Sequence, residues 1–208
     1  MCPSAAHGLP RLRGRIRISP GFWLLLGWFA AVNGWRLLTV VLLAALLHEA
    51  GHWAALRLLG GRLLSLRLGP LGAVMEGDWR RLSYGRELAV ALAGPAVNLL
   101  CALALRFLPL PEREVFAGAH FMLGVFNLLP IGPLDGGRAL RLALTWLLGP
   151  RGEAPARWIS AGAALLTAVA LAFVIRSTGG SLWLTAPIAG AIAAFAGEIL
   201  PRGEEIGR

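Results

Sequence analysis

Three ionisable side chains, His48, Glu49 and His52, lie within the apolar segment LLHEAGHWAAL at residues 46–56. On a helix, residues four positions apart project from one face about one turn apart, so both imidazoles can reach one metal ion. Glu49 is rotated by about 60° from His52, at about 100° per residue. Its carboxylate therefore lies beside the metal, where it can reach a bound water without being a ligand.

Such a set supports metal-assisted hydrolysis. A bound Zn²⁺ lowers the pKa of a coordinated water to about 7, and a nearby carboxylate can then accept its proton. An ionisable side chain in hydrocarbon costs about 3 kcal/mol. A metal site therefore explains the motif better than hydrogen bonds from the two histidines to neighbouring helices.

A catalytic zinc ion usually has three protein ligands and one open position. Asp135 is the first candidate for the third ligand, since it belongs to NLLPIGPLDGG at residues 127–137, whose prolines and glycines interrupt any helix. Broken backbone at membrane depth lines a cavity or is covered by protein. His120, within an apolar run, is the rival, although a hydrogen bond between helices also explains it. The only other aspartate, Asp78, is better explained as a partner of nearby arginines.

The composition indicates a membrane protein: 57% of the 208 residues are hydrophobic and the mean hydropathy is +0.67. All 20 basic residues are arginines, and the net charge is +9. These arginines fall between apolar runs and not in one patch with interleaved aromatic residues, which argues against a nucleic-acid partner.

Six apolar stretches predict the helices, and about 20 residues are needed to span a bilayer. They are residues 20–33, 37–59, 87–108, 115–131, 158–175 and 182–200. Alternating crossings collect most arginines on one side, which the positive-inside rule assigns to the cytoplasm. We therefore expect six spans with both termini in the cytoplasm, the first span being a retained signal anchor.

The polar connection at residues 62–86 alternates leucine with arginine or serine and breaks at Gly69, Pro70 and Gly72. This pattern favours a short β-hairpin at the cytoplasmic interface. The fold class expected is an all-α polytopic membrane protein with about six transmembrane helices and this hairpin-like loop. Residues 1–208 form a single membrane-embedded domain in this interpretation.

The motif HEAGH at residues 48–52 and the stretch NLLPIGPLDG at residues 127–136 resemble the two signatures of the site-2 protease family of intramembrane zinc metalloproteases. The resemblance covers about residues 37–140, the family's three-helix catalytic core. It implies that His48, His52 and Asp135 bind Zn²⁺ and that Glu49 is the catalytic base.

AGPAVNLL at residues 93–100 also resembles that family's intervening core helix. The resemblance implies that Asn98 and Asn127 contact an unwound substrate. Hydrogen bonds between helices are the alternative explanation for each asparagine.

No PDZ domain interrupts the chain, which most resembles the small, sporulation-type branch of the family. The resemblance implies a metalloendopeptidase that cleaves a membrane-tethered protein, such as a pro-sigma or anti-sigma factor, in or near its transmembrane segment. The expected partners are this substrate, the lipid bilayer and a regulatory membrane protein. The expected location is the plasma membrane, with the active site toward the cytoplasm.

The alternative function is a membrane metal-ion transporter that uses the same His/Asp cluster. Intramembrane His, Asp and Glu residues also mark ion pathways. The sequence shows one compact metal constellation and no second set of intramembrane acids, which favours the protease.

Overall fold

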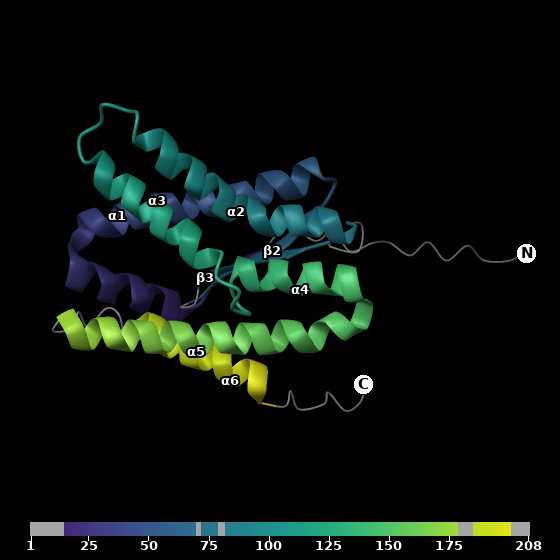
Figure 1. Cartoon of the computed structure of the whole chain (residues 1–208). Coiled ribbons are helices and arrows are strands. Elements are labelled where there is room, and N and C mark those ends of the chain that lie inside the picture. Colours follow the sequence, from purple (N-terminus) through teal and green to yellow (C-terminus); the bar gives the residue numbers. More distant parts are fainter. Residues whose placement is uncertain (1–14, 70–71, 79–81, 179–184, 201–208) are drawn as a thin grey trace, which may run out of the picture.

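The computed structural model describes residues 15–69, 72–78, 82–178 and 185–200, and it is mostly helical (Figure 1). The arginines nearest the two chain ends, on which the predicted orientation partly rests, lie outside these residues. The elements in chain order are β1 (Arg15–Ile18), α1 (Pro20–Leu58), β2 (Leu63–Gly69), β3 (Gly72–Gly77), α2 (Tyr84–Leu105), α3 (Arg113–Asn127), α4 (Asp135–Leu148), the 3₁₀ turn η2 (Gly149–Gly152), α5 (Glu153–Thr178) and α6 (Thr185–Ile199).

Helix α1 consists of two arms that meet at Gly34. This residue has φ 83° and ψ 158°, a conformation that glycine adopts without steric cost. Figure 1 shows the chain turning back at this point, so the apolar stretches predicted at residues 20–33 and 37–59 form the two arms. Next to the kink, Arg36 donates from Nε to Glu112 at 2.7 Å, which ties the kink to the start of α3.

A three-stranded sheet with the order β1-β2-β3 accompanies the helices. Strands β2 and β3 pair antiparallel within the predicted hairpin-like loop. Strand β1, which was not predicted, pairs parallel with β2, from Arg15 opposite Ser65 to Ile18 opposite Leu68. A parallel pair needs a long crossover connection, here α1, so local sequence does not reveal this pairing. The all-α description therefore omits one strand.

Helix α4 follows the broken stretch and was also not predicted as a separate helix. Its first turn packs closely against the preceding chain, because Gly136 and Gly137 are buried. A Cβ at Gly136 would overlap the Leu128 carbonyl, and one at Gly137 would overlap the Ile131 carbonyl. The two glycines thus let α4 start immediately beside the end of α3. Because α4 carries Arg138 and Arg141, its segment does not read as an apolar run.

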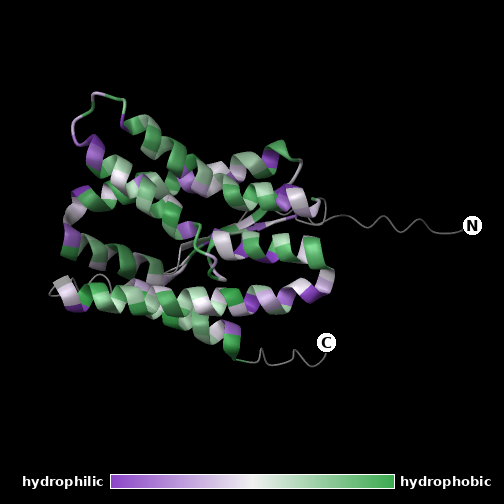
Figure 2. Cartoon of the chain, in the orientation of Figure 1, coloured by the Kyte–Doolittle hydropathy of each residue, from purple (hydrophilic) through white to green (hydrophobic). Residues whose placement is uncertain are grey.

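Three described helical segments are long and apolar enough to cross a membrane: Pro20–Leu58, Tyr84–Leu105 and Asp135–Ser177; Pro187–Ile199 is apolar but shorter. Hydrophobic residues run along most of α1, α2 and α5 (Figure 2), and large apolar side chains such as Trp35 and Leu166 are exposed. Such helices are suited to contact with lipid, so the chain is a membrane protein. The count of six crossings stays a prediction.

Candidate metal centre

The second arm of α1 and the first residue of α4 bring His48, His52 and Asp135 together. Their potential ligand atoms all lie within 4.8 Å of one another, and this is the only such group of three among the described parts of the chain. Asp135 Oδ2 lies 3.0 Å from His48 Nε2 and 3.2 Å from His52 Nε2, and the two Nε2 atoms are 3.1 Å apart. Three side chains thus face one point: two imidazoles one helical turn apart and a carboxylate 83 residues after His52.

This arrangement fits a zinc ion. Two imidazole nitrogens and one carboxylate oxygen form a ligand set typical of catalytic zinc sites. Tetrahedral ligands about 2.0 to 2.1 Å from zinc lie about 3.3 Å from one another. The separations of 3.0 to 3.2 Å between the donor atoms are close to that value. Both histidines are buried, with 5% and 8% of their surface exposed, so their placement is well determined by packing.

A backbone carbonyl of α2 orients His52. The ring Nδ1 lies 2.7 Å from the Val90 carbonyl oxygen, and because a carbonyl can only accept, Nδ1–H is the donor. The proton on Nδ1 leaves the lone pair of Nε2 free, and Nε2 is the atom that faces Asp135. Hydrogen bonds of this kind fix the tautomer and ring orientation of metal-binding histidines.

A buried polar chain orients His48 from the opposite side. Asn98 Nδ2 lies 3.2 Å from His48 Nδ1, and Asn98 Oδ1 lies 3.1 Å from His120 Nδ1. An amide side chain can turn either its oxygen or its nitrogen toward a ring, so it can serve the tautomer in which His48 Nε2 binds metal. Asn98 is completely buried, and His120 is 4% exposed. His120 therefore connects to the metal cluster through Asn98 and does not belong to it.

The two asparagines named as substrate-binding residues make contacts within the protein. Asn98 links His48 to His120, as described above, and Asn127 donates from Nδ2 to the Leu123 carbonyl of its own helix at 3.0 Å. The contacts of Asn98 are hydrogen bonds between helices, as the alternative interpretation predicts, whereas Asn127 bonds within its own helix. Contact of either asparagine with a substrate stays a prediction.

Glu49 shares a cavity of about 240 Å³ with two members of the metal cluster. Its wall contains Glu49, His52 and Asp135 together with residues Ala73 to Met75 of β3. A carboxylate outside the ligand group therefore faces the space where a substrate and a water can meet the metal. The role of Glu49 as the base stays a prediction.

Two arginines of α4, Arg138 and Arg141, line the same cavity. The sequence did not identify them as residues of the site. The available signal was their spacing, because Asp135, Arg138 and Arg141 recur every three residues and so share one helix face. They add positive charge to the wall near the metal cluster.

Known proteins are similar to this chain in sequence and in fold. The model of Peptidase family M50 matches residues 113–171. The putative zinc metalloprotease Rip3 of Mycobacterium tuberculosis is 32% identical over 79% of this chain and 45% of its own length. Stage IV sporulation protein FB of Bacillus subtilis is 31% identical over 62% of this chain and 47% of its own. The solved site-2 protease of Methanocaldococcus jannaschii superposes with a TM-score of 0.63 at 25% identity, over 88% of both chains.

The chain is similar in sequence and in fold to proteins of the site-2 protease family. It spans less than half the length of the curated relatives named above. Zinc is the metal specified in the name of Rip3, and it agrees with the donor set found here. Among the described residues, His48, His52 and Asp135 form the group that can hold the ion.

A glycine of α2 makes room for one of the histidines of this metal centre. A Cβ at Gly94 would lie 2.7 Å from both Cδ2 and Cε1 of the His52 ring. We expect Gly94→Ala to displace the imidazole and to lower zinc affinity by about 10- to 100-fold, as changes next to metal ligands commonly do. Competition with a chromophoric chelator measures the affinity.

Gly85→Ala is the matched control, since it lies on the same helix and its Cβ would meet only Trp146, at 4.0 Å. It should bind zinc as the wild type does. Equal zinc affinity in Gly94→Ala and Gly85→Ala would contradict close packing of His52 on α2.

Proposed function

We propose that this protein is an intramembrane zinc metalloendopeptidase of the site-2 protease family, and that it hydrolyses a peptide bond in or near the transmembrane segment of a membrane-tethered protein. One observation carries the proposal. His48, His52 and Asp135 converge within 4.8 Å, and Glu49 faces the cavity that His52 and Asp135 also line. Helical segments that are long and apolar enough to cross a membrane carry these residues. Glu49 and both histidines lie in Pro20–Leu58, and Asp135 begins Asp135–Ser177.

In the proposed reaction, His48, His52 and Asp135 hold the ion. Bound there, Zn²⁺ supplies Lewis acidity that polarises the scissile carbonyl and acidifies a water. Glu49 accepts the proton of the attacking water as the new C–O bond forms. The same carboxyl group then donates this proton to the amide nitrogen as the C–N bond breaks, so that the base is regenerated.

Strand β3 is proposed to present the substrate. A transmembrane helix satisfies its own carbonyls, so local unwinding must precede hydrolysis. In the described sheet β3 is an edge strand, and its residues Ala73 to Met75 line the cavity that contains Glu49. An extended peptide can add to such an edge by backbone hydrogen bonds. The broken stretch from Gly132 to Leu134 lines the same cavity.

We propose a multi-pass plasma-membrane protein with six spans and both termini in the cytoplasm, on the evidence of the arginine distribution. The catalytic core at residues 37–140 then belongs to a single domain over residues 1–208, flanked by the spans predicted at residues 20–33, 158–175 and 182–200. The similarity to Stage IV sporulation protein FB supports a pro-sigma or anti-sigma factor as the substrate class. A regulatory membrane protein remains an expected partner.

Metal removal tests the proposed function. The purified chain is placed in liposomes with a set of tagged single-span membrane proteins, and the products are separated by size. We expect cleavage of at least one substrate, its loss on chelation, and its return with Zn²⁺ but not with Mg²⁺, because nitrogen ligands favour zinc.

A zinc-sensitive dye inside the same liposomes tests the transporter alternative. Liposomes that hold substrate without the protein give the background. Zinc entry above that background, without cleavage of any substrate, would reject the protease in favour of the transporter.

A further inference from the structure

A buried polar cluster joins the two C-terminal helices to the loop that precedes Asp135. The Gly132 amide donates to Ser160 Oγ of α5 at 2.7 Å, and Ser160 Oγ donates to Glu198 Oε1 of α6 at 3.3 Å. Ser160 is 3% exposed and Glu198 is 7% exposed. The serine hydroxyl thus accepts a hydrogen bond from the loop and donates one to the carboxylate. We call Ser160 and Glu198 the loop bracket.

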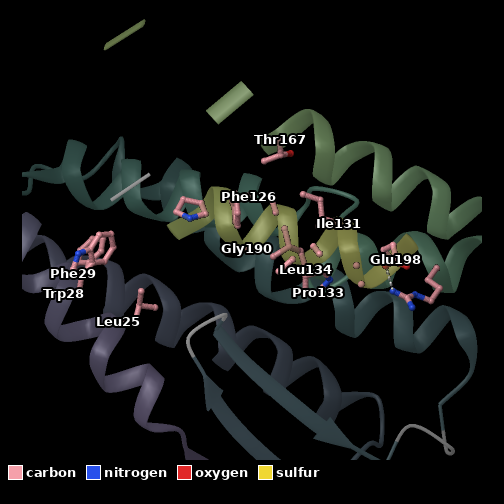
Figure 3. Close-up of a pocket in the computed structure, with 17 residues that line it drawn as sticks. Leu25, Trp28, Phe29, Phe126, Ile131, Pro133, Leu134, Thr167, Gly190 and Glu198 are labelled. Atoms are coloured by element: carbon pink, nitrogen blue, oxygen red, sulfur yellow. Dashed lines mark ion pairs between the residues drawn. The ribbon is translucent and has the colours of Figure 1, made fainter. Parts of the chain in front are cut away.

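Two arginines hold Glu198 in position from other helices. Arg157 of α5 donates from Nε and from its terminal nitrogen to the Glu198 carbonyl, at 3.3 and 3.0 Å. A terminal nitrogen of Arg141 in α4 lies 3.6 Å from Glu198 Oε1, and the two side chains are drawn with their ion pair in Figure 3. The carboxylate at the bracket is therefore connected to α4, α5 and α6.

Gly132 packs directly against the loop bracket. A Cβ at this position would overlap Glu198 Oε1 and would lie 3.3 Å from Glu198 Cδ. The absence of a side chain at Gly132 thus allows the loop backbone to approach the carboxylate and its amide to reach Ser160. Packing and hydrogen bonding fix the same residue.

The loop bracket is costly to keep. Glu198 is the single charged residue of α6, and its second oxygen, Oε2, is buried with no hydrogen-bond partner among the described residues. A carboxylate oxygen buried without a hydrogen-bond partner is unfavourable, and an apolar side chain would avoid that cost. Packing of α6 alone does not account for this glutamate.

The loop held by the bracket separates two cavities. Gly132, Pro133 and Leu134 line the metal cavity and also a larger cavity of about 590 Å³, between the first arm of α1 and α6. In Figure 3 Pro133 and Leu134 lie in the middle of this larger cavity wall, with Glu198 at one end. Asp135 directly follows Leu134 in the chain. A shift of the loop would therefore move both a wall of the metal cavity and one member of the metal cluster.

We propose that Ser160 and Glu198 are positioning residues for the metal centre: by fixing the Gly132 amide they hold the loop from which Asp135 reaches His48 and His52. The two C-terminal helices then contribute to the site through this bracket. The catalytic consequence rests on the proposed function, whereas the effects on the loop and on zinc affinity do not.

Ser160→Ala tests the bracket in the full-length chain in detergent. We expect hydrogen exchange at the Gly132 amide to accelerate at least about tenfold, since the amide loses its acceptor, and zinc affinity to fall about tenfold. With a cleavable substrate, kcat should fall as well, because the Asp135 member of the metal cluster is displaced. Ser160→Thr, which retains the hydroxyl, should restore all three. Ser177→Ala is the matched control, as this exposed serine of α5 donates to the Val174 carbonyl of its own helix.

Glu198→Gln supplies a second variant that does not depend on the folding of Ser160→Ala. It should weaken zinc binding by itself and add little to Ser160→Ala, because the two side chains act on the loop through one hydrogen-bonded chain. Wild-type exchange at Gly132 and wild-type zinc affinity in Ser160→Ala would overturn the proposal, as would equal loss of zinc affinity in Ser160→Ala and Ser160→Thr. If the wild type cleaves no substrate, the proposed function fails, while the exchange and zinc measurements still decide the bracket.

Discussion

Replacement of Glu49 by glutamine is expected to remove peptide hydrolysis while the protein keeps its zinc. The amide has almost the same shape as the carboxylate and cannot accept the proton of the attacking water. General acid–base catalysis by one side chain contributes about 10²- to 10⁴-fold, and kcat should fall by at least that factor. Because Glu49 does not belong to the group formed by His48, His52 and Asp135, zinc content should not change.

The measurement compares cleavage of a tagged single-span substrate with zinc per mole of protein in the same preparations. Glu153→Gln is the matched control, since this glutamate is exposed in the first turn of α5. Retained cleavage in Glu49→Gln would show that another group handles the proton. Zinc flux across the membrane that survives in Glu49→Gln, with no cleavage by the wild type, would favour the transporter.

Asp135→Ala is expected to lose both zinc and activity. This change removes the single carboxylate oxygen of the cluster, so two imidazoles remain for an ion that usually requires three protein ligands. Zinc affinity should fall by more than the roughly 10- to 100-fold that is typical of changes around the ligands. Competition with chelators of graded affinity measures the loss.

Two further variants make the Asp135 result specific. Asp78→Ala removes the only other aspartate of the chain and should leave zinc affinity unchanged. His120→Ala should have a smaller effect than Asp135→Ala, because His120 contacts Asn98 and reaches the cluster only through it. If Asp135→Ala kept full zinc stoichiometry and His120→Ala lost it, the third ligand would be His120.

The residues with the most distinctive chemistry were accessible from local spacing. Helical periodicity places His48 and His52 on one face with Glu49 beside them, and the prolines and glycines of residues 127–137 predict a broken stretch beside the site. Membrane character follows from composition, since apolar runs of helical length have few other uses. These features involve residues that are close in the sequence, and the geometry of the helical backbone fixes the relative positions of such residues.

Contacts between distant segments depended on packing. Spacing left Asp135 and His120 as rivals, and the difference between them arises because α4 starts beside the two histidines while Asn98 stands between His120 and His48. Strand β1 needs a partner beyond the whole of α1. The loop bracket joins residues 28 and 38 positions apart. Which side chains meet across such separations depends on how whole helices pack, and local propensity carries no information about that.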